Sequence, residues 1–307
     1  MGALDDVRAY VERVAAPALA AAAPDLWPRV ACGLVGNGSE CLGLDDGLSR
    51  DHDWGIDFYL WVLDEDADQV PRLERLKAKL MLEHPPAHVR ATSEFGVGPR
   101  VMTVSAFYTE LIGRADVPVG WRSWRAIPEE NLLLATNGAV FVDGPGVFSA
   151  VRAGLLGYYP RDLWLKRMAA RCMALAQTGQ YNLARMEARG DVVAVNQTLA
   201  RFIDEAEQLT FLLNRAYRPY YKWAWRMLCE LPVLGSQVGE LLRRLVGAAG
   251  DREGRQCLAD EVCALLLGEL RRQGLVTTGD WFLATAGVEL QGLIEDPVLR
   301  AVPPQYD

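Results

Sequence analysis

The order of apolar and polar residues predicts a mixed first half of the chain. Apolar residues recur at helical spacing from Leu4 to Ala18, which predicts an opening amphipathic helix that ends before Pro24. The polar stretch 68–83 predicts a surface helix. Four short apolar runs predict strands, and they cover residues 29–35, 56–63, 101–105 and 139–142.

The pattern changes near residue 160, after which helical periodicity continues to residue 294. Its clearest example begins at Leu199 and stops at Pro219, with apolar residues on one side of the predicted helix. No low-complexity linker separates the halves. With 307 residues at about 150 per domain, we expect two domains, an α/β domain over 1–158 and an all-helical bundle over 159–307, hence the α+β class.

Composition narrows the functional classes. Half the residues are hydrophobic, 23% are charged and mean hydropathy is +0.02, as in folded, soluble proteins. A net charge of -8 argues against a main task of binding long nucleic acid, although it leaves room for a local basic strip. No apolar run reaches the about 18 residues of a membrane helix, and the N-terminus lacks the cationic region of a secretory signal. We therefore expect a cytoplasmic protein with no membrane partner.

The number and spacing of cysteines and histidines exclude several kinds of metal site and enzyme. No C-x-x-C pair is present, so we predict free, buried thiols at Cys32, Cys41, Cys172, Cys229, Cys257 and Cys263. Prolines between His84 and His88 prevent a helical zinc pair, and no histidine follows that could complete a HEPN-type ribonuclease. The signatures of serine hydrolases, P-loop proteins and Rossmann folds are also missing.

One segment combines residue types that suit a polyphosphate. The strand predicted at 29–35 runs into a small-residue turn, where Gly38 and the hydroxyl of Ser39 permit close approach of an anion. Asp51 and Asp53 then form a D-x-D at the head of the next strand, where alternation places both carboxylates on one face. Two acids held together require a cation, and oxygen ligands beside a polyphosphate favour magnesium.

These four residues resemble the signature of the nucleotidyltransferase superfamily, the polymerase-beta-like fold, and within it the kanamycin type. Longer stretches resemble a bacterial family of uncharacterised nucleotidyltransferase-like proteins that carry a domain of unknown function. The similarity runs over about residues 38–232 and includes GSECLGLDDGLSRDHDWG, NGAVFVDGPGVFS, YYPRDLWLKRMAARCMALAQTGQYNLAR and LLNRAYRPYYKW. It implies a nucleotidyltransferase-type mixed sheet with flanking helices, followed by a helical bundle on the substrate side.

The resemblance also implies a reaction. Asp51 and Asp53 would be the catalytic metal ligands for Mg²⁺ or Mn²⁺, and Gly38 and Ser39 would hold the β and γ phosphates. An acceptor hydroxyl then attacks the α-phosphorus in line and pyrophosphate leaves. We expect transfer of a nucleoside monophosphate, with AMP from ATP as the first choice, to a hydroxyl of a small molecule or a protein.

A third carboxylate, usual on a neighbouring strand in active members, is missing from residues 99–104. Asp57 and Asp143 are the first substitutes to consider, followed by Glu110 and Glu205. The missing third carboxylate favours an alternative function, a nucleotide-binding or regulatory module that has lost catalysis. A structural interaction protein without a ligand ranks last, because it would leave the paired aspartates without a cation.

The helical half offers further candidates for nucleotide contacts. Gln180, Tyr181 and Asn182, together with residues 217–222, place amides, rings and cations at a predicted corner between helices. Aromatic rings can stack on a base, and Lys166 or Lys222 can contact phosphate. Packing of these aromatic rings in the core is the alternative.

Overall fold

The computed structural model describes residues 2–50, 54–90 and 98–307, which form two compact units. Unit 1 comprises Met1–Val119 and Ala126–Gly157, and unit 2 comprises Gly120–Arg125 and Tyr158–Asp307. The main division follows Gly157, one residue before the boundary that we place from the sequence. The short segment Gly120–Arg125 groups with the second unit, which the sequence does not indicate.

Unit 1 is built on a four-stranded mixed sheet with the order β3-β2-β1-β4. The strands are β1 (Val30–Leu34), β2 (Tyr59–Val62), β3 (Val101–Thr103) and β4 (Ala139–Asp143). β1 is antiparallel to both of its neighbours, β2 and β4, whereas β2 and β3 are parallel. Together with the helical unit 2, this sheet confirms the α+β class.

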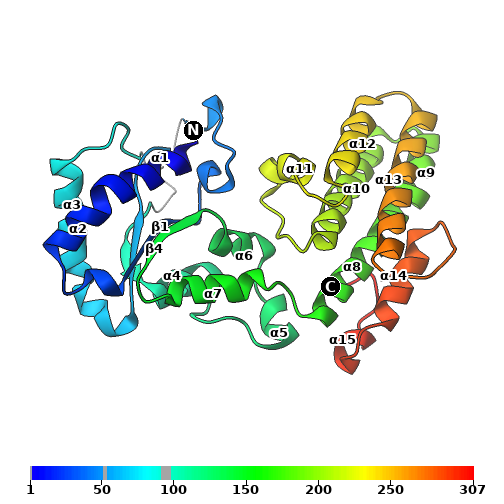
Figure 1. Cartoon of the computed structure of the whole chain (residues 1–307). Helices are drawn as coiled ribbons and strands as arrows, with labels where there is room; N and C mark the ends of the chain where they lie inside the picture. Colours follow the sequence, from blue (N-terminus) through cyan, green and yellow to red (C-terminus); the bar gives the residue numbers. More distant parts are fainter. Residues whose placement is uncertain (1, 51–53, 91–97) are drawn as a thin grey trace. The chain divides into compact units, whose positions relative to one another are not determined.

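The N-terminal helices and α3 cover one face of the sheet (Figure 1). The predicted opening helix is confirmed as one continuous helical segment, in which α1 (Ala3–Tyr10) and α2 (Ala16–Ala22) are joined by the π-helical turn η1 (Val11–Ala15). The polar stretch forms α3 (Val70–Glu83). Alternate residues of β1 and β2 point into this core, which includes Val7, Val11, Leu19, Cys32, Leu34, Phe58, Leu60 and Leu73.

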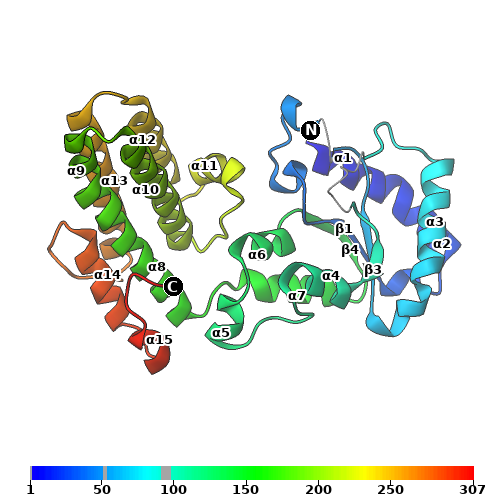
Figure 2. The same ribbon diagram turned by 180° about the vertical axis from the view of Figure 1, so that it is seen from behind.

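Helices that we did not predict cover the opposite face (Figure 2). α4 (Val104–Ile112) and α7 (Val147–Leu156) contribute Phe107 and Phe148, which pack on Trp61 of β2 with ring centroids 5.3 and 3.9 Å away. α6 (Glu129–Thr136) packs against both helices. The 3-10 turns of unit 1 are η2 (Trp27–Arg29), η3 (Ser39–Leu42), η4 (Gly47–Arg50) and η5 (Asp64–Gln69).

Three predicted strands are shorter than expected; β1 loses one residue at each end, and the other two lose more at one end. β2 begins at Tyr59 instead of residue 56, because Gly55 has a φ of 120° and Ile56 makes only an isolated bridge to Val89. β3 ends at Thr103 because the hydroxyl of Thr103 accepts a hydrogen bond from the amide of Ala106, 3.1 Å away, and so caps α4.

Unit 2, whose residues are all described, contains helices and no strand. Its helices are α5 (Gly120–Arg125), α8 (Arg161–Leu175), the π-helical η6 (Ala176–Asn182), α9 (Leu183–Arg189), α10 (Val192–Leu213), α11 (Tyr221–Cys229), α12 (Gly235–Gly247), α13 (Arg252–Arg272), α14 (Leu283–Gly292) and α15 (Pro297–Ala301). α8 packs against both α10 and α14, so it lies inside the bundle. Among the described residues, no helix of either unit has the length and apolar character needed to cross a membrane.

Candidate functional site

The predicted phosphate turn lies where β1 leaves the sheet. Gly36 and Gly38 have φ angles of 109° and 119°, values that favour glycine, and η3 begins at Ser39. Asn37 is exposed, while Gly38 and Ser39 are half-buried. The turn therefore has one side open to solvent.

The side chain of Asn137, just before β4, holds this turn. Its Oδ1 accepts a hydrogen bond from the amide of Gly36, and its Nδ2 donates to the Gly36 carbonyl, both at 2.8 Å. The amide of Gly138 donates to the carbonyl of Cys41 at 2.9 Å. These bonds fix the backbone before and after Ser39 to the segment that enters β4.

An ion pair inside unit 1 connects the turn to the chain that enters β2. The guanidinium of Arg90 donates to the carboxylate of Glu40, which is 1% exposed, and to the carbonyl of Asn37 at 3.3 Å. The backbone of Arg90 in turn pairs with Ile56, whose carbonyl accepts from the Arg90 amide at 3.4 Å. Ile56 stands three positions after Asp53 in the sequence.

This ion pair also gives Gly38 a structural role. A Cβ at position 38 would lie 2.5 Å from either carboxylate oxygen of Glu40. Only glycine leaves room for that carboxylate at the φ observed here. The requirement for glycine at position 38 therefore exists without a bound phosphate.

The predicted metal ligands Asp51 and Asp53 lie outside the described residues, as does His52. The flanking acids that are described each have a partner. Asp45 accepts from the amide of Ala3 at 2.7 Å, and Asp46 accepts from the amide of Leu48 at 3.1 Å. Across residues 2–50, 54–90 and 98–307, no three His, Cys, Asp or Glu side chains come together as metal ligands.

Asp57, one of our two first candidates for the third carboxylate, pairs with Lys77 at 2.6 Å. We expected it on the face of Asp51 and Asp53 if the strand were regular through Gly55. That condition is not met, because the positive φ of Gly55 interrupts the alternation before β2.

The other candidates for a third carboxylate have partners as well. Asp143 accepts hydrogen bonds from the amides of Gly146 and Ser149 at 2.9 and 2.8 Å, at the start of α7. Glu110 pairs with Arg100. Glu205 belongs to unit 2, where it pairs with Arg171 at 3.0 Å and burial raises its pKa.

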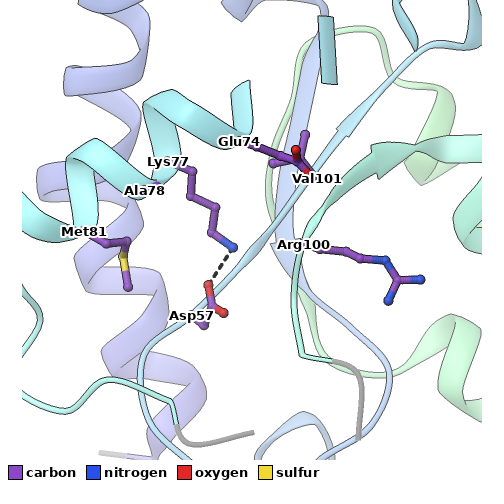
Figure 3. Close-up of a pocket in the computed structure, with 7 residues that line it drawn as sticks. All are labelled: Asp57, Glu74, Lys77, Ala78, Met81, Arg100 and Val101. Atoms are coloured by element: carbon purple, nitrogen blue, oxygen red, sulfur yellow. Dashed lines mark ion pairs between the residues drawn. The ribbon is translucent and has the colours of Figure 1, made fainter. Parts of the chain in front are cut away.

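A pocket of about 350 Å³ lies between α3 and the starts of β2 and β3 (Figure 3). Its lining residues are Asp57, Glu74, Lys77, Ala78, Met81, Arg100 and Val101. Lys77 also donates to the carbonyls of Phe58 and Pro99, at 2.5 and 3.2 Å, so its ammonium joins the two strands. We did not predict Lys77 and Arg100 as pocket residues. In the sequence they appear only as a charged residue of a polar helix and a charged residue beside a short strand.

Lys166 does not fit the role of a phosphate ligand. Its side chain is 0% exposed, and its Nζ donates to Oε1 of Gln291 at 2.9 Å and to the carbonyls of Val302 and Pro303 at 2.8 and 2.7 Å. Its three protons thus meet three acceptors within unit 2. Burial lowers the pKa of Lys166 to about 8.

The expected corner of Tyr181, Asn182 and Lys222 is not formed. Tyr217 packs against Tyr159, just before α8, at a ring-centroid distance of 5.4 Å. Tyr181 lies near the opposite end of the helical segment that α8 and η6 make, about 30 Å away at 1.5 Å per residue. Tyr217 is buried, whereas Tyr181, which receives a hydrogen bond from Arg185 at 3.0 Å, is 53% exposed.

The geometry thus defines an α+β protein with a glycine-rich turn at the edge of a mixed sheet and a separate helical unit. A family model described as "Domain of unknown function (DUF4037)" matches residues 124–224, about a third of the chain. That stretch includes β4 and the helices from α6 to α10. No curated protein and no solved structure matches the chain.

Proposed function

We propose that the chain is a metal-dependent nucleotidyltransferase that moves a nucleoside monophosphate, in the first instance AMP from ATP, to a hydroxyl of a small molecule or protein. The observation that supports this most is the antiparallel pairing of β1 and β2, which ends at Gly33 and Tyr59. Because antiparallel neighbours exchange ends, the Gly38–Ser39 turn and the chain that enters β2 leave the sheet at the same edge.

Arg90 strengthens this proposal. Its side chain binds Glu40 and Asn37 of the turn, while its backbone pairs with Ile56, shortly after the D-x-D motif in the sequence. The turn and the chain that enters β2 are thereby linked through one residue.

In the proposed reaction, the acceptor oxygen forms a bond to the α-phosphorus, and the bond from that phosphorus to the pyrophosphate oxygen breaks. Ser39 and the backbone of the turn would contact the β and γ phosphates. Mg²⁺ or Mn²⁺ would be held by Asp51 and Asp53, since the described acids beside them already have partners. A bound metal ion would neutralise charge on the phosphate oxygens.

A second function, a nucleotide-binding or regulatory module without catalysis, is favoured by one specific observation. β3, the parallel neighbour of β2, carries no carboxylate, and the alternatives Asp57, Asp143 and Glu110 have partners of their own. Such a module would use the same turn.

The test is to incubate the purified protein with each α-labelled nucleoside triphosphate, Mg²⁺ or Mn²⁺ and a cell extract. Label transfer by the wild type should fall about 100-fold or more in Asp51→Asn and in Asp53→Asn, the size expected for a lost charge-stabilising group. Asp68→Asn, a change of an exposed acid on the surface of unit 1, serves as the matched control. Thermal stabilisation by nucleotide and metal without transfer would support the module, and no response to any nucleotide would reject both functions.

A further inference from the structure

One segment of unit 2 departs from the acidic character of the chain. Residues 214–229 contain no acid in a protein whose net charge is -8. The cations are Arg215, Arg218, Lys222 and Arg226, and the aromatic residues are Tyr217, Tyr220, Tyr221, Trp223 and Trp225. This is the local basic strip that the overall composition leaves possible, combined with aromatic rings.

The fold pairs one of these cations with acids and places another over an aromatic ring. Arg218 pairs with Asp204 at 2.8 Å and with Glu207 at 2.5 Å, and the guanidinium of Arg215 lies 4.0 Å from the ring centroid of Trp164. Arg215 remains exposed, so the exposed positive charge of the segment is shared by Arg215 and α11.

The exposed side of α11 carries two rings and two cations in adjacent positions. Tyr221 and Trp225 are 70% and 41% exposed, and the neighbouring Lys222 and Arg226 are exposed as well. The two rings stand one helical turn apart, about 6 Å along the axis, as do the two cations. We call these four residues the α11 stripe.

The rings of the α11 stripe are held by neighbours. The indole nitrogen of Trp225 donates to the carbonyl of Gly239 of α12 at 3.0 Å, and the ring of Tyr221 contacts that of Tyr220 at 4.4 Å between centroids. Tyr220 is itself 49% exposed. Rings that are fixed in place lose little conformational freedom when a flat group stacks on them.

We propose that the α11 stripe binds single-stranded nucleic acid. Every base offers a face that can stack on Tyr221 or Trp225, and the phosphates between bases can meet Lys222 and Arg226. The stripe presents no amide or carboxylate that would read base edges, so binding should tolerate many sequences. This site is separate from the Gly38–Ser39 turn and does not depend on the proposed transferase activity.

A membrane surface is a less suitable partner. Helices that lie in a bilayer interface insert an apolar face, yet Ala224 and Leu228 of α11 are buried in unit 2. Double-stranded nucleic acid would meet the two cations but would not offer unpaired bases to the rings.

The test measures binding of the full-length protein to fluorescein-labelled 12-nucleotide U and dT strands and to a 12-base-pair duplex by fluorescence anisotropy. We expect both strands to bind and the duplex to bind at least 10-fold more weakly. Tyr221→Ala should weaken strand binding about 10-fold, the value of one lost stacking contact, while Tyr221→Phe should retain it. Trp281→Ala, at a 64% exposed aromatic residue of the same unit, is the matched control and should leave affinity unchanged.

The cations give a second, independent measurement. Removing two phosphate contacts in the Lys222→Gln, Arg226→Gln variant should lower the slope of log affinity against log salt by about 1.4. Equal affinity for strand and duplex, an unchanged affinity in Tyr221→Ala, or binding to anionic lipid vesicles but not to the strands would each overturn the proposal. Circular dichroism of each variant checks that unit 2 remains folded.

Discussion

The guanidinium of Arg90 and the carboxylate of Glu40, 50 positions apart in the sequence, form an ion pair in the interior of unit 1. The pair joins the turn after β1 to the chain before β2, and the Glu40 carboxylate leaves no room for a side chain at position 38. It is therefore the first interaction to test in the neighbourhood of the proposed site.

Breaking this pair should destabilise the protein strongly. In Arg90→Met the carboxylate of Glu40 stays buried without its guanidinium, which should cost about 3–5 kcal/mol in the free energy of unfolding by urea. The matched control is Glu110→Gln, which breaks the half-exposed pair with Arg100 and should cost less than about 1 kcal/mol. Equal effects of the two substitutions would contradict the structural role of Glu40 and Arg90.

The explanation given for Gly38 predicts coupling between two substitutions. Gly38→Ala should lower the free energy of unfolding because its Cβ would meet the Glu40 carboxylate. In a Glu40→Ala background that contact is gone, so the cost of Gly38→Ala should shrink to the backbone strain of about 1–3 kcal/mol at this positive φ. Urea unfolding of both single variants and the double variant provides the cycle, and strictly additive effects would disprove the explanation.

The burial of the Lys166 ammonium predicts a specific pH dependence of the free energy of unfolding. Burial lowers its folded-state pKa from 10.5 to about 8, while nearby Asp307 raises this pKa and Arg125 lowers it, each by a smaller amount. Between pH 8 and 10.5 the unfolded chain therefore holds the proton that the folded protein has lost, so the free energy of unfolding should rise with pH. The rise is on the order of 3 kcal/mol at 1.36 kcal/mol per pKa unit, and it is complete above pH 10.5.

The measurement compares urea unfolding of the wild type and Lys166→Met from pH 7.5 to 10.5. Because other titrating groups are shared, the difference between the two proteins isolates Lys166. A difference that stays constant across this range would show that the ammonium is not destabilised in the bundle.

The different exposure of the cysteines predicts that they react with a thiol reagent at different rates. All six are free and four are buried. Cys229 is half-buried and Cys257 is exposed, so the expectation of a buried thiol is wrong for Cys257. Burial raises the pKa of Cys172 to about 12 and also raises that of Cys263, which keeps both as unreactive thiols. One fast phase with Ellman's reagent should disappear in Cys257→Ser, and an unchanged fast phase would locate the reactive thiol elsewhere.

Local patterns predicted the local elements well. The N-terminal helices follow from periodicity because one face is buried against the sheet, β1 follows from a short apolar run whose residues are all buried, and α3 follows from a polar stretch. The early end of β3 and the start of α4 were missed, since a hydroxyl cap at Thr103 overrides a run of strand-forming residues. Gly55 likewise ended the alternation on which the placement of Asp57 depended.

The partners of residues that meet only in the folded protein could not be predicted from the sequence. Lys166 looks like a solvated cation on an amphipathic helix, but α8 is covered by α10 on one side and α14 on another, so polar positions are buried too. The same limit applies to Asp57, Asp143 and Glu110, whose partners are set by tertiary contacts. Residue types could suggest which acids belong to a site, but not which were already paired.

Two of the three acceptors of Lys166 are main-chain carbonyls, those of Val302 and Pro303. A carbonyl is present whatever side chain its residue carries, so positions 302 and 303 can change identity without loss of these bonds. Inserting a residue after Ala301, or deleting one from the last turn of α15, would instead shift the oxygens away from the ammonium. In related chains we therefore expect variation in composition here but constancy in loop length.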